Sequence, residues 1–96
     1  MKMIFHKKAN EELLKARDYY DKIIFGLGKQ FIIEIENSLN KIKVSPFLYQ
    51  LYLKEIRKCN TKTFPFSIYY DINDKYIRIL AIAHQKRKPD YWKNRL

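Results

Sequence analysis

The sequence predicts an α+β domain: a helical hairpin packed on a mainly antiparallel four-stranded sheet, in the order β-α-α-β-β-β, with a short C-terminal helix. Two consecutive segments near the N-terminus carry apolar residues at helical spacing, and Gly26 and Gly28 separate them. The second half holds segments rich in aromatic and β-branched residues, and the turn-forming pair Asn73-Asp74 separates the last two. Helices followed by a run of strands are typical of the α+β class.

The composition predicts one domain spanning residues 1–96. A chain of 96 residues with 47% hydrophobic content can bury a single core. The lone Cys59 excludes an internal disulfide, and no paired cysteines have metal-ligand spacing, so we expect no metal and no other cofactor. We find neither a signal peptide nor an apolar run of membrane-spanning length, so we expect a cytoplasmic protein that does not contact membranes.

The N-terminal half is expected to hold a short strand at residues 2–5 and then the helical hairpin. Residues 8–25 should form the first helix, and the second should end before Ser45-Pro46, because proline forces its predecessor into extended geometry. The expected buried face of the first helix holds Ala9, Leu13, Ala16, Tyr20, Ile23 and Ile24. That of the second holds Phe31, Ile35, Leu39 and Ile42.

The C-terminal half is expected to hold three strands. An aromatic loop at residues 47–52 precedes a strand at 53–59, a turn at 60–63, and a hairpin of strands at 67–72 and 75–84. Strict alternation in the last strand would place one set of side chains against the helices: Ile77, Ile79, Ala81 and Ala83. The other set would lie on a partly open face available to a partner: Arg78, Leu80, Ile82 and His84.

The charge is strongly positive and unevenly placed. The net charge is +10, and residues 53–96 contribute +7 of it, with 11 basic and 4 acidic side chains. Such a potential attracts polyanions or acidic protein surfaces. We therefore expect the C-terminal half to meet the partner, through the following target- or nucleic-acid-binding candidates: Arg57, Lys58, Lys62, Arg78, Lys86, Arg87 and Arg95.

Three residues near the C-terminus could support RNA cleavage if the protein were a nuclease. His84 could act as a general base or acid, Arg87 could hold charge on a phosphate, and Tyr91 could stack on a base. These catalytic candidates have structural alternatives. His84 could cap a backbone group at the strand end, Arg87 could belong to a solvated basic run, and Trp92 is expected in the core.

Several motifs, taken in order, resemble the RelE/ParE superfamily of toxins from bacterial type II toxin–antitoxin modules. They are Tyr19-Tyr20, Ser45-Pro46, the run Phe64-Pro65-Phe66-Ser67-Ile68-Tyr69-Tyr70, and the ending from His84 to Arg95 with Pro89, Tyr91 and Trp92. The resemblance covers nearly the whole chain and implies the predicted element order. It also implies a cognate antitoxin, which we expect to carry a short acidic amphipathic segment that covers the open sheet face or the groove beside the helices.

The superfamily contains two activities, and the motifs favour one of them. RelE-like members are ribosome-dependent mRNA endoribonucleases, whereas ParE-like members inhibit DNA gyrase. RelE-like nucleases carry a basic residue near the start of the first hairpin strand, where this chain has Phe66. The resemblance therefore favours a ParE-like toxin that targets gyrase. The alternatives are a RelE-like nuclease acting on the ribosome and mRNA, and an inactive nucleic-acid-binding or adaptor domain.

Overall fold

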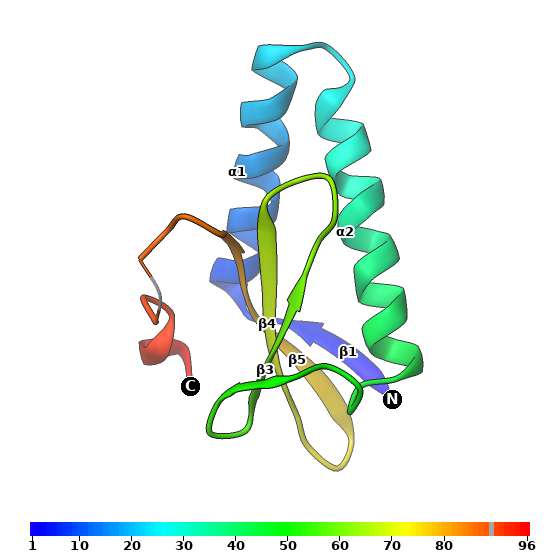
Figure 1. Ribbon diagram of the computed structural model, residues 1–96, viewed down its shortest axis with the longest axis vertical. Coiled ribbons are helices and arrows are strands. Elements are labelled where there is room, and N and C mark those ends of the chain that lie inside the picture. The colour runs from blue at the N-terminus through cyan, green and yellow to red at the C-terminus, as the bar shows by residue number, and fades with distance from the viewer. Residues whose placement is uncertain (89) are drawn as a thin grey trace.

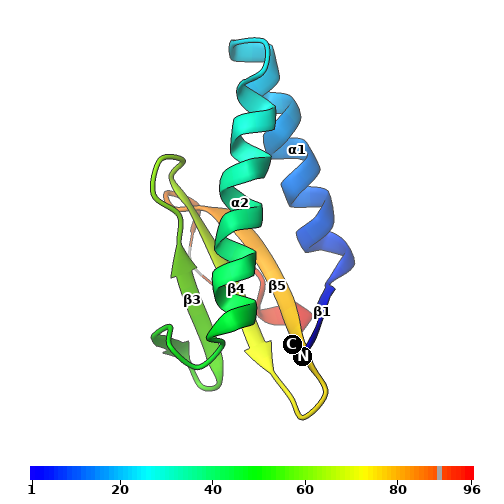
Figure 2. The ribbon, with the colours of Figure 1, turned by 90° about the vertical axis from the view of Figure 1, so that its right-hand side faces the viewer.

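The computed structural model describes residues 1–88 and 90–96 and confirms the α+β fold class. Two helices lie beside one sheet, and the helical hairpin projects beyond the strands (Figure 1, Figure 2). The sheet has five strands rather than the four expected. In chain order the elements are β1 (Lys2–Phe5), α1 (Lys7–Ile23), α2 (Leu27–Val44), β2 (Leu51–Leu53), β3 (Ile56–Asn60), β4 (Phe66–Ile72), β5 (Tyr76–His84) and a 3-10 turn, η1 (Lys93–Arg95).

The sheet is mixed but mainly antiparallel, with strand order β1-β5-β4-β3-β2. Strand β1 pairs in parallel with β5, which lies more than 70 residues later in the chain. The strand predicted over residues 53–59 is broken by a turn, in which Lys54 has a φ of 50°, and Leu53 pairs back onto Ile56. The resulting edge strand β2 occupies part of the predicted aromatic loop. This turn could not be predicted from its residues, Lys54 and Glu55, because neither is a typical turn former such as Gly, Pro or Asn.

The two helices pack closely at their connection. Gly26 ends the turn in the left-handed region, with a φ of 89°. A Cβ on Gly28 would lie 2.5 Å from the backbone oxygen of Arg17, so only glycine allows this approach of α2 to α1. Helix α1 ends at Ile23, before the predicted residue 25. Ile23 and Ile24, expected on the buried face, are instead exposed at the tip of the hairpin, because this tip extends past the sheet (Figure 1).

A β-bulge in β5 overturns the predicted division of its side chains between the two faces. Tyr70 pairs with Ile79 but Tyr69 pairs with Ala81, so Leu80 is an extra residue and the alternation shifts there. Ile77 and Ile79 pack in the helix-facing core as expected, and Ile82 joins them. Leu80, Ala81 and Ala83 lie in the core on the opposite face. Strict alternation cannot hold across a bulge, which has no signature in this sequence.

The second sheet face, predicted to be partly open, is covered by the chain itself. The C-terminal segment (residues 85–88 and 90–96) lies along this face on the side of α1 and away from α2 (Figure 1). Trp92 is fully buried, and its ring centroid lies 4.8 Å from that of Tyr69. The prediction that Trp92 belongs to the core is confirmed, and the part of this face beneath Trp92 is covered by the chain itself.

A carboxylate on α2 holds the loop before β4. Glu34 accepts hydrogen bonds from the backbone N–H groups of Thr63 and Phe64, at 2.9 and 2.7 Å. Burial opposes ionisation of Glu34, but these N–H donors outweigh it and lower the pKa of the carboxyl group. The loop is therefore tied to α2 by an ionised glutamate.

We expect Glu34→Gln to destabilise the protein by about 1–2 kcal/mol near neutral pH, because an amide cannot accept both hydrogen bonds. A lowered folded-state pKa gives stability that is complete above the ordinary glutamate pKa and is lost as the pH falls through the lowered value. Urea unfolding between about pH 6 and pH 3 should show the gap between wild type and variant closing. Glu36→Gln, at an exposed position of α2, is the control. A gap that persists at the acid end would contradict the assigned role.

Candidate functional site

The C-terminal segment and the sheet enclose a hollow of about 260 Å³ that holds four of the predicted site residues. Lys58 comes from β3, His84 ends β5, and Arg87 and Tyr91 come from the C-terminal segment. The remaining walls are polar or aromatic side chains with one alanine: Tyr52, Tyr69, Ala83, Gln85, Lys88 and Trp92. We call this hollow the tail cavity.

The cations of the tail cavity are held over aromatic rings. The Lys58 Nζ atom lies 5.2 Å from the ring centroid of Tyr52 and 5.8 Å from that of Tyr69. The Arg87 guanidinium carbon lies 3.5 Å from the ring centroid of Tyr91, as in a stacked pair. Cation–π contact fixes the direction of each charge without neutralising it. The cavity thus presents oriented positive charge beside aromatic rings.

Glu12 on α1 holds the C-terminal segment in place. Its Oε1 atom accepts from the backbone N–H of Ile82 and from Arg95, both at 3.0 Å. Its Oε2 atom accepts from the Tyr91 hydroxyl at 2.5 Å and from Arg95 at 2.9 Å. Arg87 lies at 3.5 Å from the same oxygen. One carboxylate therefore connects α1, the bulged part of β5 and the C-terminal segment.

Glu12 is not among the predicted site residues, although the sequence contains a sign of its role. Helical spacing from Ala9 places Glu12 and Leu13 one turn later and Ala16 two turns later, on the same face. A carboxylate within an otherwise apolar stripe needs a buried partner. That partner is Arg95, whose side chain is only 7% exposed and which also donates to the Leu80 carbonyl at 3.0 Å.

Two of the three catalytic candidates, His84 and Tyr91, already form hydrogen bonds within the protein. The His84 Nδ1 atom accepts from the Lys86 backbone N–H at 3.1 Å, which is the capping role considered as an alternative. The His84 ring also contacts the Phe66 ring, with centroids 5.4 Å apart. Burial and the neighbouring Glu12 raise the pKa of Tyr91, so its hydroxyl stays protonated near neutral pH. The geometry favours binding at this site over acid–base chemistry.

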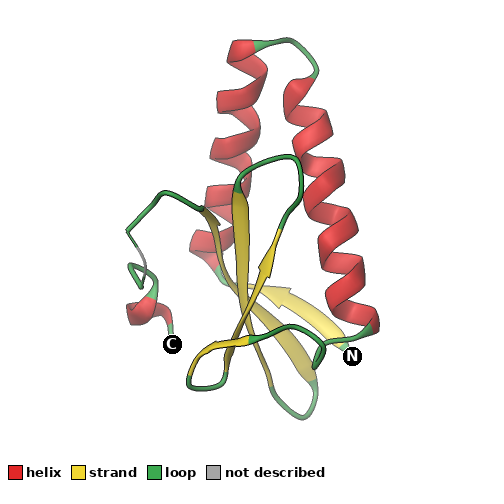
Figure 3. Ribbon diagram, in the orientation of Figure 1, coloured by secondary structure: helices red, strands yellow, loops and turns green. Residues whose placement is uncertain are grey.

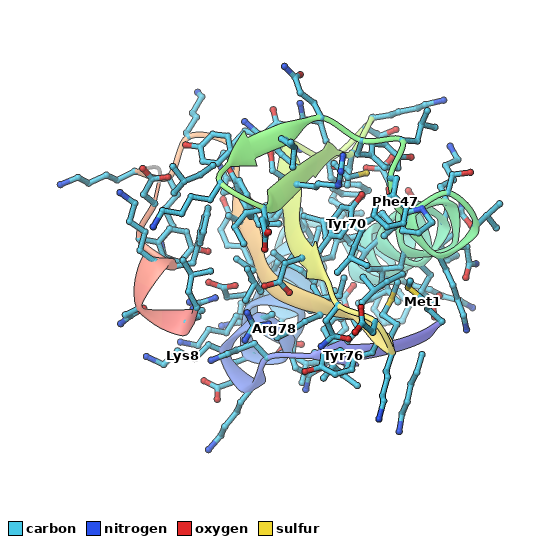
Figure 4. All side chains as sticks on the ribbon, turned by 90° about the horizontal axis from the view of Figure 1, so that it is seen from below. Met1, Lys8, Phe47, Tyr70, Tyr76 and Arg78 are labelled. Carbon is cyan, nitrogen blue, oxygen red and sulfur yellow. The ribbon has the colours of Figure 1, made fainter. Side chains whose placement is uncertain are left out.

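The other predicted binding cations do not gather in the tail cavity. Arg95 is buried against Glu12, and Lys86 is exposed near the cavity. Arg78 is paired with Asp71 at 2.6 Å, and Figure 4 places it on the side of the sheet towards Lys8.

Two further cations lie elsewhere on the molecule. Arg57 donates to backbone carbonyls of the loop that follows α2. Lys62 lines a separate hollow against α2.

Pro89, part of the ending that carries the resemblance, lies outside the described residues. Among the residues that are described, no three His, Cys, Asp or Glu side chains are grouped as metal ligands require, and none of the helices is long and apolar enough to cross a membrane.

The match to a known family covers most of the chain. Residues 3–89 match the model of the ParE toxin of the type II toxin–antitoxin system parDE. The chain belongs to the ParE toxin family. The predicted resemblance to the RelE/ParE superfamily, with the ParE-like branch favoured, is thereby confirmed.

A solved structure shares the ParE-family fold. A chain from the chromosomal ParDE TA system of P. aeruginosa superposes with a TM-score of 0.67 at 19% identity, over 88% of this chain and 95% of that chain. At such low identity the likeness concerns the fold alone. No curated protein matches the sequence.

Proposed function

We propose that this ParE-family protein is the toxin of a type II toxin–antitoxin module, that it arrests growth by binding DNA gyrase, and that a cognate antitoxin neutralises it. The observation that carries the proposal is the family match over residues 3–89. Because gyrase acts on DNA inside the cell, the proposal places the toxin in the cytoplasm.

The tail cavity supports a binding mechanism. General acid–base catalysis needs a group that can exchange a proton near the working pH. The Nδ1 atom of His84 accepts a hydrogen bond from the Lys86 backbone N–H, and the Tyr91 hydroxyl, whose pKa is raised by burial and by Glu12, donates to Glu12. In contrast, Lys58 and Arg87 are oriented over aromatic rings and can donate hydrogen bonds to a carboxylate of an acidic protein surface.

The net charge supports the same mechanism. A chain of net charge +10 is drawn towards acidic surfaces, and the attraction falls as salt screens it. Binding through the tail cavity should therefore weaken with increasing ionic strength. A toxin that acts by occupying a surface needs only affinity, which the oriented cations and their aromatic floor supply.

The test is DNA supercoiling by purified gyrase on relaxed plasmid, with the toxin titrated to saturation. Inhibition is expected, with no effect on a different topoisomerase assayed in the same buffer. Gyrase that remains fully active at saturating toxin would remove the target assignment. Slow growth on expression of the toxin without an antitoxin is expected as well, and unimpaired growth would favour an inactive nucleic-acid-binding or adaptor domain.

A RelE-like, ribosome-dependent mRNA endoribonuclease is the second candidate. One observation favours it: His84, Arg87 and Tyr91 all line the tail cavity. Primer extension on translated mRNA after induction distinguishes the two activities. New cuts within codons would support the nuclease, whereas intact mRNA together with inhibited gyrase would support the proposal above.

A further inference from the structure

The segment that joins α2 to β2 exposes several large apolar side chains close together. The exposed fractions are 82% for Val44, 64% for Phe47, 75% for Leu48 and 52% for Leu51. Figure 3 shows this connection as a long loop crossing the foot of the molecule. Single exposed apolar residues are ordinary, but four within eight positions form a patch, and such patches mark interaction sites. We call it the 44–51 patch.

The backbone of the patch is fixed from the inside. The buried Tyr70 donates its hydroxyl to the Pro46 carbonyl at 2.7 Å. Arg57 donates to the carbonyls of Tyr49 and Phe47, at 2.6 and 3.2 Å. Figure 4 places Phe47 beside the end of α2, with Tyr70 next to it on the side of the sheet. A partner would meet a loop that is already ordered, so docking costs little conformational entropy.

Two hollows lie along the 44–51 patch. The first, of about 330 Å³, is lined by Val44, Leu48 and Lys41 among others. The second, of about 250 Å³, is lined by Phe47, Leu51 and neighbouring residues. An apolar side chain can anchor in each, as in grooves that bind amphipathic segments.

The charges around the hollows indicate the chemistry of the partner. Lys41 lines the first hollow, and Lys54 and Arg57 line the second, against the single carboxylate of Glu55. Within the described part of the chain, none of these three cations has an ion-pair partner. A complementary segment would carry carboxylates beside its apolar anchors.

We propose that the 44–51 patch is the docking site for an amphipathic, acidic segment of the cognate antitoxin, an inference that rests on the proposed function. A second copy of this chain fits poorly, because two surfaces of net positive charge would meet. The face of the sheet once expected to receive the antitoxin is filled by Trp92 and the rest of the C-terminal segment. The patch offers the apolar anchors and unpaired cations that such a segment requires.

The experiment measures binding of the product of any small open reading frame found directly beside this gene, purified as the probe. The test variant is Val44→Glu with Leu48→Glu, and the matched control is Ile23→Glu with Ile24→Glu at the hairpin tip, a second group of exposed apolar side chains that lines neither hollow. All four positions are more than half exposed, so both double variants should keep the wild-type circular dichroism spectrum and melting temperature. Each changes the net charge equally, which separates the site from general electrostatics.

We expect the patch variant to raise the dissociation constant by about tenfold or more, and the tip variant to leave it within about twofold. Wild-type binding that survives unchanged in the patch variant would overturn the docking site and leave the proposed function intact. Loss of binding in the tip variant alone would also overturn it. If the wild-type chain binds no product of a neighbouring gene, the proposed function itself fails, and the docking site with it.

Discussion

Replacing Glu12 with alanine is expected to destabilise the protein by roughly 3–5 kcal/mol, because a buried cation would lose its only carboxylate. The Arg95 side chain is 7% exposed and that of Glu12 is 13% exposed, so water cannot replace the lost partner. Tyr91 and the Ile82 backbone N–H would lose their acceptor as well. Urea unfolding followed by circular dichroism gives the free energy directly.

The neighbouring Glu11 supplies the control for Glu12. Glu11 lies on the same helix but is exposed, so Glu11→Ala should change the stability by no more than about 0.5 kcal/mol. The double variant Glu12→Ala with Arg95→Ala should be more stable than the sum of the single changes predicts, because it leaves no unpaired charge. Additive losses would show that the two residues do not act as a pair.

Trp92→Ala is expected to lower the free energy of unfolding by about 3–5 kcal/mol. Trp92 is fully buried and is the largest side chain between the sheet and the C-terminal segment. Its removal leaves a cavity beside Tyr69 and uncovers Leu80 and Ala81. Because it is the single tryptophan, circular dichroism must replace fluorescence as the probe of unfolding.

The control for Trp92 is an aromatic residue of nearly complete exposure. Phe25 is 98% exposed at the hairpin tip, and Phe25→Ala should alter the stability by less than about 0.5 kcal/mol. A loss below about 1 kcal/mol for Trp92→Ala would mean that the C-terminal segment is not part of the folded core.

Local pattern predicted the elements of this fold better than their packing. The buried face of α2 follows from periodicity, because Phe31, Ile35 and Ile42 recur at helical spacing and are buried. The buried face of α1 begins with Ala9 in the same way. The bulge at Leu80 does not follow, since a bulge depends on how two strands pair and not on either strand alone. One extra residue moved Ala81 and Ala83 to the opposite face.

The site was predicted in part for the same reason. His84, Arg87 and Tyr91 are close in sequence, so proximity alone placed them together in the tail cavity. Lys58 joins them because β3 pairs with β4. Its positive charge made Lys58 a candidate, but the sequence could not show that it lies beside the other three residues. Glu12 lies 70 residues or more along the chain from the groups it binds, and only the folded chain shows the connection.

The C-terminal segment has two roles in this arrangement. It covers part of the second face of the sheet, and it supplies Arg87 and Lys88, two of the cations that line the tail cavity, while Lys58 comes from β3. Stability and target binding are therefore coupled through Glu12 and Trp92. Variants of Lys58 and Arg87 separate stability from target binding, because neither side chain belongs to the hydrophobic core.

The most direct test compares inhibition of gyrase supercoiling by the wild-type protein and by Lys58→Ala with Arg87→Ala. Lys15→Ala with Lys29→Ala, at exposed positions of the helical hairpin, removes the same charge as a control. If the tail cavity binds the target, the first double variant should need at least about tenfold more protein for half-inhibition, and the control should match the wild type. Equal inhibition by all three proteins would show that the target binds elsewhere.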